Sequence, residues 1–124
     1  MAELKDIVFD CENAPQLARF WAAAVDDYDI RPYDDAEIQR LAALRLTPET
    51  DPTVAVDGPR GSLFFQQVPE AKIGKNRVHV DLIATDRTRE TERLISLGAS
   101  LHHEYADHTV MLDPEGNEFC LCDP

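Results

Sequence analysis

The sequence predicts an α+β fold made of two strand–helix–strand–strand–strand modules, which form a curved mixed β-sheet with the helices on its convex face. Three observations predict this fold. The length of 124 residues suits one domain spanning 1–124. The same order of elements is predicted twice, over about 4–69 and about 76–123. Placing Asp6 on His79 also brings both predicted helix starts, Asn13 and Asp86, into register, as an internal repeat requires.

The first module opens with a strand over 5–11 ("KDIVFDC"), in which apolar and acidic residues alternate. A helix follows in "ENAPQLARFWAAAV". Asn13 suits the N-cap and Pro15 suits the first turn. The helix then presents an apolar stripe at helical spacing, which we expect to be buried: Leu17, Phe20, Trp21 and Val25.

The rest of the first module contains a short strand in "YDIRPY" and a second helix in "DDAEIQRLAALRL". Asp34 or Asp35 is the expected N-cap, and one side of the helix carries Ile38, Leu41 and Leu44. "ETDPT" ends this helix. Two strands, over 53–56 and 63–68, are then separated by the turn sequence "DGPRG".

The second module follows a polar connector, "VPEAKIGKN". Its first strand is predicted over 77–84, and its helix runs from a cap at Asp86 or Thr88 through Leu97 to a stop at Gly98. "DPEG" has the residues that a type I turn favours. The remaining strands are predicted over 100–105, 109–112 and 118–122.

The segment "KNRVHVDLIATD" carries the first candidate functional residues. In a strand, Arg77, His79 and Asp81 share one face and the other face carries Val78, Val80 and Leu82. We expect the apolar residues to pack under the helix and the ionisable residues to face a cleft on the concave side. His79 and Asp81 would then serve as proton-transfer groups. The alternative is a histidine hydrogen-bonded for structural reasons beside a solvated aspartate.

Composition excludes some classes of partner. Twenty-four acidic residues against twelve lysines and arginines give a net charge of −12, which disfavours binding of nucleic acid. No apolar run is long enough to span a membrane, and the first residues do not resemble a signal peptide. The three cysteines include a pair separated by one residue, which suits a reduced cytoplasmic protein better than a disulfide framework.

Three other clusters have two interpretations each. Cys120 and Cys122 share a strand face, either as small buried hydrophobes or, with His79 nearby, as a reactive thiolate site. In "HHEYADH", a strand would point His102 and His103 to opposite faces, so an exposed edge is favoured over a metal site. The basic run Lys72, Lys75 and Arg77 either holds an anionic substrate or pairs with surface acids.

Four stretches, "FDCENAPQLARFW", "FFQQVPEAKIGKNRVHVDL", "SLGAS" and "LDPEGNEFCL", resemble the vicinal oxygen chelate superfamily. This superfamily includes glyoxalase I, bleomycin-resistance proteins and extradiol dioxygenases. Within it, the chain is similar to short glyoxalase-like proteins common in actinobacteria. The resemblance covers nearly the whole chain, and the helix near residues 34–46 looks like an insertion. It implies a glyoxalase-like fold, and a homodimer is expected.

The resemblance also implies metal ligands on the first and last strands of each module. The matching positions carry His79 and Asp6 on the first strands, and Cys120 and Gln66 (or Gln67) on the last strands. A thiol at Cys120 favours zinc over magnesium, and a protein without any metal is the other interpretation. The expected substrate contacts are Val8 and Arg77.

Two functions are compatible with this resemblance. The first is lyase or isomerase chemistry on a small oxygenated metabolite, aided by a divalent metal. The second is metal-free binding of a drug or metabolite without turnover, as in bleomycin-resistance proteins. A third interpretation is a protein–protein interaction module that keeps only the scaffold.

Overall fold

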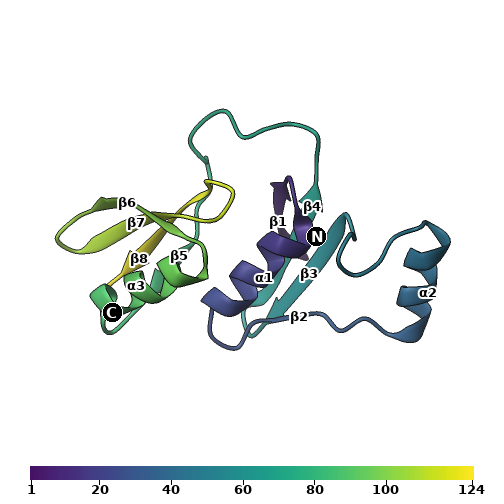
Figure 1. Ribbon diagram of the computed structural model, residues 1–124. Helices are drawn as coiled ribbons and strands as arrows, with labels where there is room; N and C mark the ends of the chain where they lie inside the picture. The colour runs from purple at the N-terminus through teal and green to yellow at the C-terminus, as the bar shows by residue number, and fades with distance from the viewer. The chain divides into compact units, whose positions relative to one another are not determined.

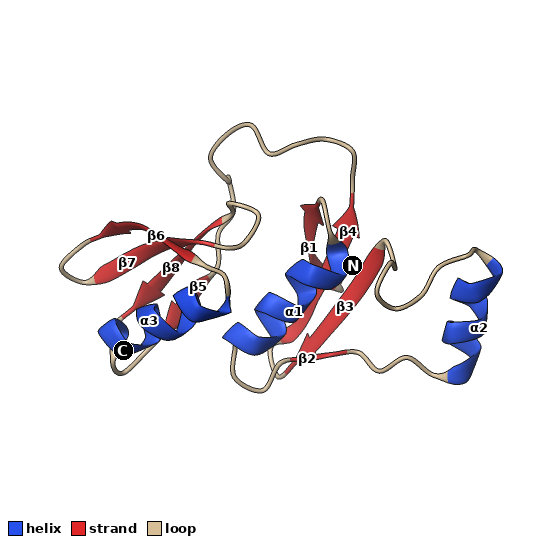
Figure 2. Cartoon of the chain, viewed as in Figure 1, coloured by secondary structure: helices blue, strands red, loops and turns tan.

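Three helices and eight strands make up the chain, and the strands form two four-stranded sheets (Figures 1 and 2). A computed structural model describes residues 1–124. The chain divides into two compact units, Met1–Ala71 and Lys72–Pro124, which we call unit 1 and unit 2. Each unit contains one mixed sheet, which confirms the predicted α+β class and the repeated module.

Unit 1 has a sheet in the order β1-β4-β3-β2, in which β1 and β4 are parallel and the other pairs are antiparallel. The insertion predicted near residues 34–46 is the helix α2, which lies between β2 and β3. The elements are β1 Asp6–Cys11, α1 Ala14–Ala24, β2 Asp29–Ile30, α2 Asp35–Ala43, β3 Thr53–Gly58 and β4 Gly61–Gln67.

The helix α1 covers one face of this sheet by packing on β3 and β4. Asn13 caps it as predicted, because its side-chain oxygen accepts a hydrogen bond from the backbone N–H of Gln16 at 3.1 Å. The fully buried Trp21 lies 5.4 Å from the ring of Phe9, which in turn stacks on Phe65 at 5.1 Å. An aromatic core therefore fixes the helix to the sheet.

The helix α2 is capped by Asp34, whose carboxylate accepts a hydrogen bond from the N–H of Glu37 at 2.8 Å. Of the three apolar residues predicted along one side, only Leu41 is buried. Ile38 and Leu44 are exposed, and Leu44 lies just beyond the last helical residue. The helix is therefore anchored at one residue rather than along a continuous apolar stripe.

Unit 2 repeats the topology of unit 1, with the sheet order β5-β8-β7-β6 and parallel β5 and β8. The helix α3 packs on β6, β7 and β8. Its buried Leu94 is the repeat counterpart of Trp21, and both are fully buried. The elements are β5 Asp81–Ile83, α3 Arg87–Leu97, β6 Ser100–Glu104, β7 His108–Leu112 and β8 Glu118–Cys122.

Both ends of α3 confirm their sequence signals. Asp86 is the N-cap, and its carboxylate accepts a hydrogen bond from the N–H of Arg89 at 3.0 Å. Gly98 follows the last turn with φ 120°, a conformation that favours glycine. The "DPEG" turn also forms, since the N–H of Gly116 donates to the carbonyl of Asp113 at 2.9 Å. No helix of the chain is both long enough and apolar enough to cross a bilayer.

The strand predicted over 77–84 is shorter than expected. The strand β5 begins at Asp81, whereas Arg77 and Val78 form a bend, and Val78 is 77% exposed rather than packed under the helix. The physical reason is that the side chain of Glu118, the first residue of β8, holds the preceding segment. The N–H of Asn76 donates to the carboxylate of Glu118 at 2.9 Å. The pairing of β5 with β8 therefore begins only at Asp81 and Cys120.

Candidate functional site

The sheet of unit 2 has one face covered by α3 and one face open, and the alternation along β8 distinguishes them. Phe119 and Leu121 are buried on the helix side. Cys120 and Cys122 are half-buried on the other side, which we call the open face. The two thiols therefore share a face, as the alternation in the sequence predicted.

The strand register places a row of chemically different side chains across the open face. Asp81 pairs with Cys120 on the adjacent parallel strand. Cys120 pairs with Val110 on its other side, and Val110 pairs with His103 on the edge strand β6. Directly paired residues in adjacent strands project to the same face, so these four side chains are neighbours in a line.

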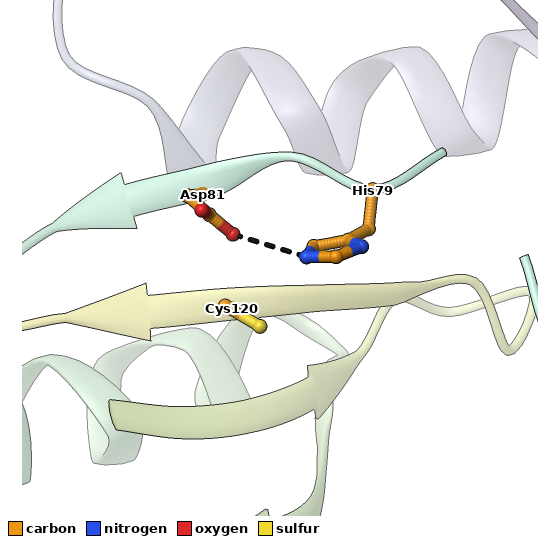
Figure 3. Close-up of side chains that lie close together, drawn as sticks. All are labelled: His79, Asp81 and Cys120. Atoms are coloured by element: carbon orange, nitrogen blue, oxygen red, sulfur yellow. Dashed lines mark ion pairs between the residues drawn. The ribbon is translucent and has the colours of Figure 1, made fainter. Parts of the chain in front are cut away.

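His79, Asp81 and Cys120 form the candidate centre of the site (Figure 3). Figure 3 shows His79 and Asp81 on one stretch of chain, with Cys120 on the neighbouring strand β8. Nε2 of His79 lies 3.3 Å from Oδ1 of Asp81, and the side chains are 42% and 61% exposed. The possible ligand atoms of all three residues lie within 4.8 Å of one another.

Burial and nearby negative charge keep the thiols of the site protonated. Burial raises the pKa of the Cys120 thiol above its ordinary value, and the charge of Asp81 and a hydrogen bond with it raise this pKa further. Burial also raises the pKa of Cys122, again with a contribution from Asp81. The reactive-thiolate interpretation of these cysteines is therefore disfavoured, since neither is an activated nucleophile at neutral pH.

The cluster fits zinc better than magnesium. Zinc accepts nitrogen, oxygen and sulfur ligands in tetrahedral geometry, which puts ligand atoms about 3.5 Å apart. The three ligand atoms lie within 4.8 Å of one another, so small side-chain movements would suffice to reach that separation. Magnesium requires an octahedron of oxygen ligands, which an imidazole and a thiol do not supply. The exposure of His79 and Asp81 leaves one side of the cluster open to a small molecule.

The candidates Asp6 and Gln66 lie in unit 1, where the register separates them along the sheet. Asp6 pairs with Ser62, whereas Gln66 pairs with Asp10, four residues further on. At about 3.3 Å per residue, that offset is about 13 Å. The role of Asp6 and Gln66 as metal ligands stays a prediction.

The repeat also assigns a different counterpart to Cys120. Val8 is the repeat equivalent of Asp81, and Val8 pairs with Phe64 just as Asp81 pairs with Cys120. Phe64 rather than Gln66 therefore occupies the equivalent position in unit 1. Phe64 and Gln66 lie on the same face of β4, so the register of β1 with β4, rather than the face, distinguishes the two positions.

The two expected substrate contacts are accessible. Val8 is 52% exposed on β1. Arg77 is exposed in the bend before β5. Their role in substrate binding stays a prediction. His102 and Glu104 do not join a group of side chains close enough to share an ion, since the cluster of His79, Asp81 and Cys120 is the one such group in the chain.

Unit 2 also contains a group of aromatic contacts that the sequence pattern did not predict. The rings of His103 and Tyr105 lie 4.3 Å apart, and those of Tyr105 and His108 lie 4.6 Å apart. The three rings lie where the antiparallel strands β6 and β7 join, and the N–H of Tyr105 donates to the carbonyl of His108 at 2.8 Å. The available signal was the number of rings in the short segment "HHEYADH".

Comparison with known proteins places these observations in context. A family model described as "Glyoxalase-like domain" matches residues 6–122. No curated protein sequence matches the chain.

Solved structures show the same fold at low sequence identity. The fosfomycin resistance protein FosX from Mesorhizobium loti matches with a TM-score of 0.68 and 14% identity, over 98% of this chain and 91% of that one. A glyoxalase/bleomycin resistance protein/dioxygenase family enzyme from Burkholderia phytofirmans matches with a TM-score of 0.66 and 15% identity, over 98% of both chains.

Proposed function

Because this chain belongs to the family of glyoxalase-like domains, we propose that it is a metal-dependent lyase or isomerase acting on a small oxygenated metabolite. The observation that carries the proposal is the cluster of His79, Asp81 and Cys120 on the open face of unit 2. The cluster combines three side chains of types that bind metals, and two of them, His79 and Asp81, are exposed to solvent. The fosfomycin-resistance and glyoxalase-type proteins of the same fold support a small-molecule role.

The three residues have distinct roles in this proposal. His79, Asp81 and Cys120 would hold the ion, and a bound zinc would polarise an oxygen of the substrate as a Lewis acid. Asp81 has a second carboxylate oxygen beyond the one facing His79. That oxygen can accept a proton from a carbon next to a carbonyl group. Arg77 and Val8 are the proposed substrate contacts.

The second candidate function is metal-free binding of a drug or metabolite without turnover. The specific observation that favours it is the raised pKa of both thiols on the open face. A metal must displace the thiol proton of Cys120 to use its sulfur, and the higher that pKa, the weaker the apparent affinity.

Elemental analysis of protein purified without chelator distinguishes the two functions. We expect near-stoichiometric zinc in the unaltered chain, loss of most zinc in Cys120→Ser, and retention in Cys122→Ser as the matched control. Circular dichroism of both variants checks the fold. Absence of metal from the unaltered protein, also after incubation with zinc, contradicts the proposed metal-dependent activity and favours the binding function.

Thermal-shift screening then tests for a ligand, because binding to the folded state raises Tm. Small acids, thiol adducts and aromatic antibiotics are suitable probes. A protein that neither holds metal nor responds to any of them would be an interaction module.

We also propose that the protein is a homodimer. The strands β1 and β5 are at the edges of their sheets and carry exposed apolar side chains, among them Ile7 and Ile83. Exposed apolar edges favour association. Sedimentation equilibrium at micromolar concentration should give twice the mass of the chain, and a monomer mass would contradict this.

A further inference from the structure

We propose that a hollow on the open face of unit 2 binds a planar aromatic ligand that carries an acidic group. The hollow has a volume of about 430 Å³. This inference rests on the proposed function, since it names the class of small molecule that the same face would take. The hollow is lined by Lys75, His102, His103, Tyr105, Val110 and Glu118.

Aromatic rings form one wall of the hollow. His103 and Tyr105 meet edge to face, with ring centres 4.3 Å apart and planes inclined by 61°. Tyr105 stacks on His108 at 4.6 Å, with planes inclined by 13°. Tyr105 is nevertheless 49% exposed. A ring ordered by two neighbours and still accessible is suited to stack with a flat ligand.

A β-bulge shapes the same wall. Leu101 pairs with Met111 and His103 pairs with Val110, so His102 is an extra residue opposite no partner. A regular strand would point His102 and His103 to opposite faces, but both line the hollow. Bulges re-aim side chains in this way and are frequent beside functional sites.

The charges in the hollow favour an acid on the ligand. Glu118 is occupied by Lys72, at 3.1 Å, and by the N–H of Asn76, at 2.9 Å. Lys75, which lines the hollow, forms no salt bridge and no hydrogen bond with any residue of the chain. It is therefore the lysine available to an acidic group of a ligand. Because an exposed lysine contributes little on its own, ring stacking must supply a comparable part of the affinity.

The hollow adjoins the metal cluster. Val110 lines the hollow and pairs with Cys120, which pairs with Asp81. Adjacent strands are about 4.8 Å apart, so Asp81 lies about 10 Å from Val110 across the sheet. A ligand stacked on Tyr105 would therefore extend toward the reactive cluster.

Three simple probes test the proposal on the intact, chelator-treated protein by NMR titration of backbone amides. Benzoate carries both features, cyclohexanecarboxylate lacks the aromatic ring, and benzamide lacks the charge. We expect benzoate to bind about tenfold more tightly than either of the others, with shifts at His103 and Val110.

Two variants separate the contribution of ring stacking from the contribution of the lysine charge. Tyr105→Leu should bring benzoate to the affinity of cyclohexanecarboxylate, and Lys75→Gln should bring it to that of benzamide. Lys5→Gln removes the same charge from an exposed site of unit 1 and should leave benzoate binding unchanged. Equal binding of benzoate and cyclohexanecarboxylate to the unaltered protein, no binding at all, or a preference that survives Tyr105→Leu would overturn the proposal.

The metal plays no part in these titrations, so their outcome is independent of the zinc analysis. Protein that holds zinc but shows no preference for benzoate would retain the metal proposal and eliminate this one. Protein that holds no zinc but prefers benzoate would eliminate the metal proposal and retain the ligand proposal.

Discussion

Cys120 and Cys122 show how position decides the role of identical residues. Both project to the open face of one strand, but Cys120 pairs with Asp81, whereas Cys122 pairs with Ile83. Only Cys120 joins a group of three possible metal ligands, with His79 and Asp81, whose ligand atoms lie within 4.8 Å of one another. The carboxylate of Asp81, which is proposed as a metal ligand, also adds to the effect of burial in raising the pKa of the Cys120 thiol.

Replacing Asp81 by Asn should lower the pKa of Cys120, because it removes a neighbouring negative charge. In metal-free protein at neutral pH, iodoacetamide should alkylate the unaltered Cys120 more slowly than an ordinary free cysteine, and the rate should rise several-fold in Asp81→Asn. Mass spectrometry of the peptide containing Cys120 measures the rate. Asp10→Asn, at an exposed site of unit 1, is the matched control, and equal rates in Asp81→Asn and the unaltered protein would contradict this assignment.

Asp57 provides a pH-dependent contribution to stability. Hydrogen bonds from Arg31, at 2.8 and 2.9 Å, and from Ser62 lower the pKa of Asp57 from 3.8 to about 2. A carboxyl group with a lowered folded-state pKa stabilises the protein above its ordinary pKa, and this stabilisation is lost as pH falls through about 2. The side chain is 43% exposed, so solvent screening limits the effect to about 1 kcal/mol or less.

Denaturant unfolding of Asp57→Asn at two pH values measures this contribution. The variant should be less stable than the unaltered protein at pH 6, and the difference should shrink at pH 2, where the aspartate is itself becoming protonated. A difference that is the same at both pH values would contradict the assignment.

At the scale of elements, the helix caps are the clearest local signals. Asn13 and Asp86 occupy equivalent positions in the two modules. The side-chain oxygen of each accepts a hydrogen bond from the backbone N–H of the residue three positions later in the chain. Asp86→Ala should lower the free energy of unfolding by about 1 kcal/mol, because an N–H of the first turn loses its partner. Denaturant titration checks it, with Thr88→Ala, at an exposed helical position, as the control. Because alanine has a higher helix propensity than threonine, Thr88→Ala should not lower stability, and an equal loss in both variants would contradict capping as the cause.

The strands were less predictable than the helices, for two physical reasons. The alternation in "KNRVHVDLIATD" fits a strand from Arg77, but the hydrogen bond from Asn76 to Glu118 delays the ladder until Asp81. The place of Gln66 relative to Asp6 depends on the register between β1 and β4, that is, on which residues of the two strands pair. Pairing between strands more than fifty residues apart is set by packing in the assembled sheet rather than by either segment.

At the scale of the whole molecule, we propose that the two units form one domain and unfold together. Unit 2 comprises only residues 72–124, and so small a unit has a limited core of its own. The one family model also spans both units. Leu94 is fully buried in unit 2, and the only tryptophan, Trp21, is fully buried in unit 1.

Leu94→Ala should therefore shift the unfolding transition that Trp21 fluorescence reports. The expected cost is about 3 kcal/mol, from lost burial and the cavity left behind. Circular dichroism should show the same midpoint as the fluorescence. If the Trp21 transition is unchanged while the circular dichroism develops a separate early transition, the units are independent domains.

The sequence by itself determined the repeated module, the helices and their caps, the turn at Asp113–Gly116 and the shared face of Cys120 and Cys122. These features depend on spacing and on hydrogen bonds within a few residues, so the local pattern contains the information. Only the tertiary structure decided that Asp81 lies beside Cys120, that Gln66 lies beside Asp10 on β1, and that Tyr105 borders a hollow. These features depend on the register between distant strands, which is set when the buried faces of the sheet pack against the helices.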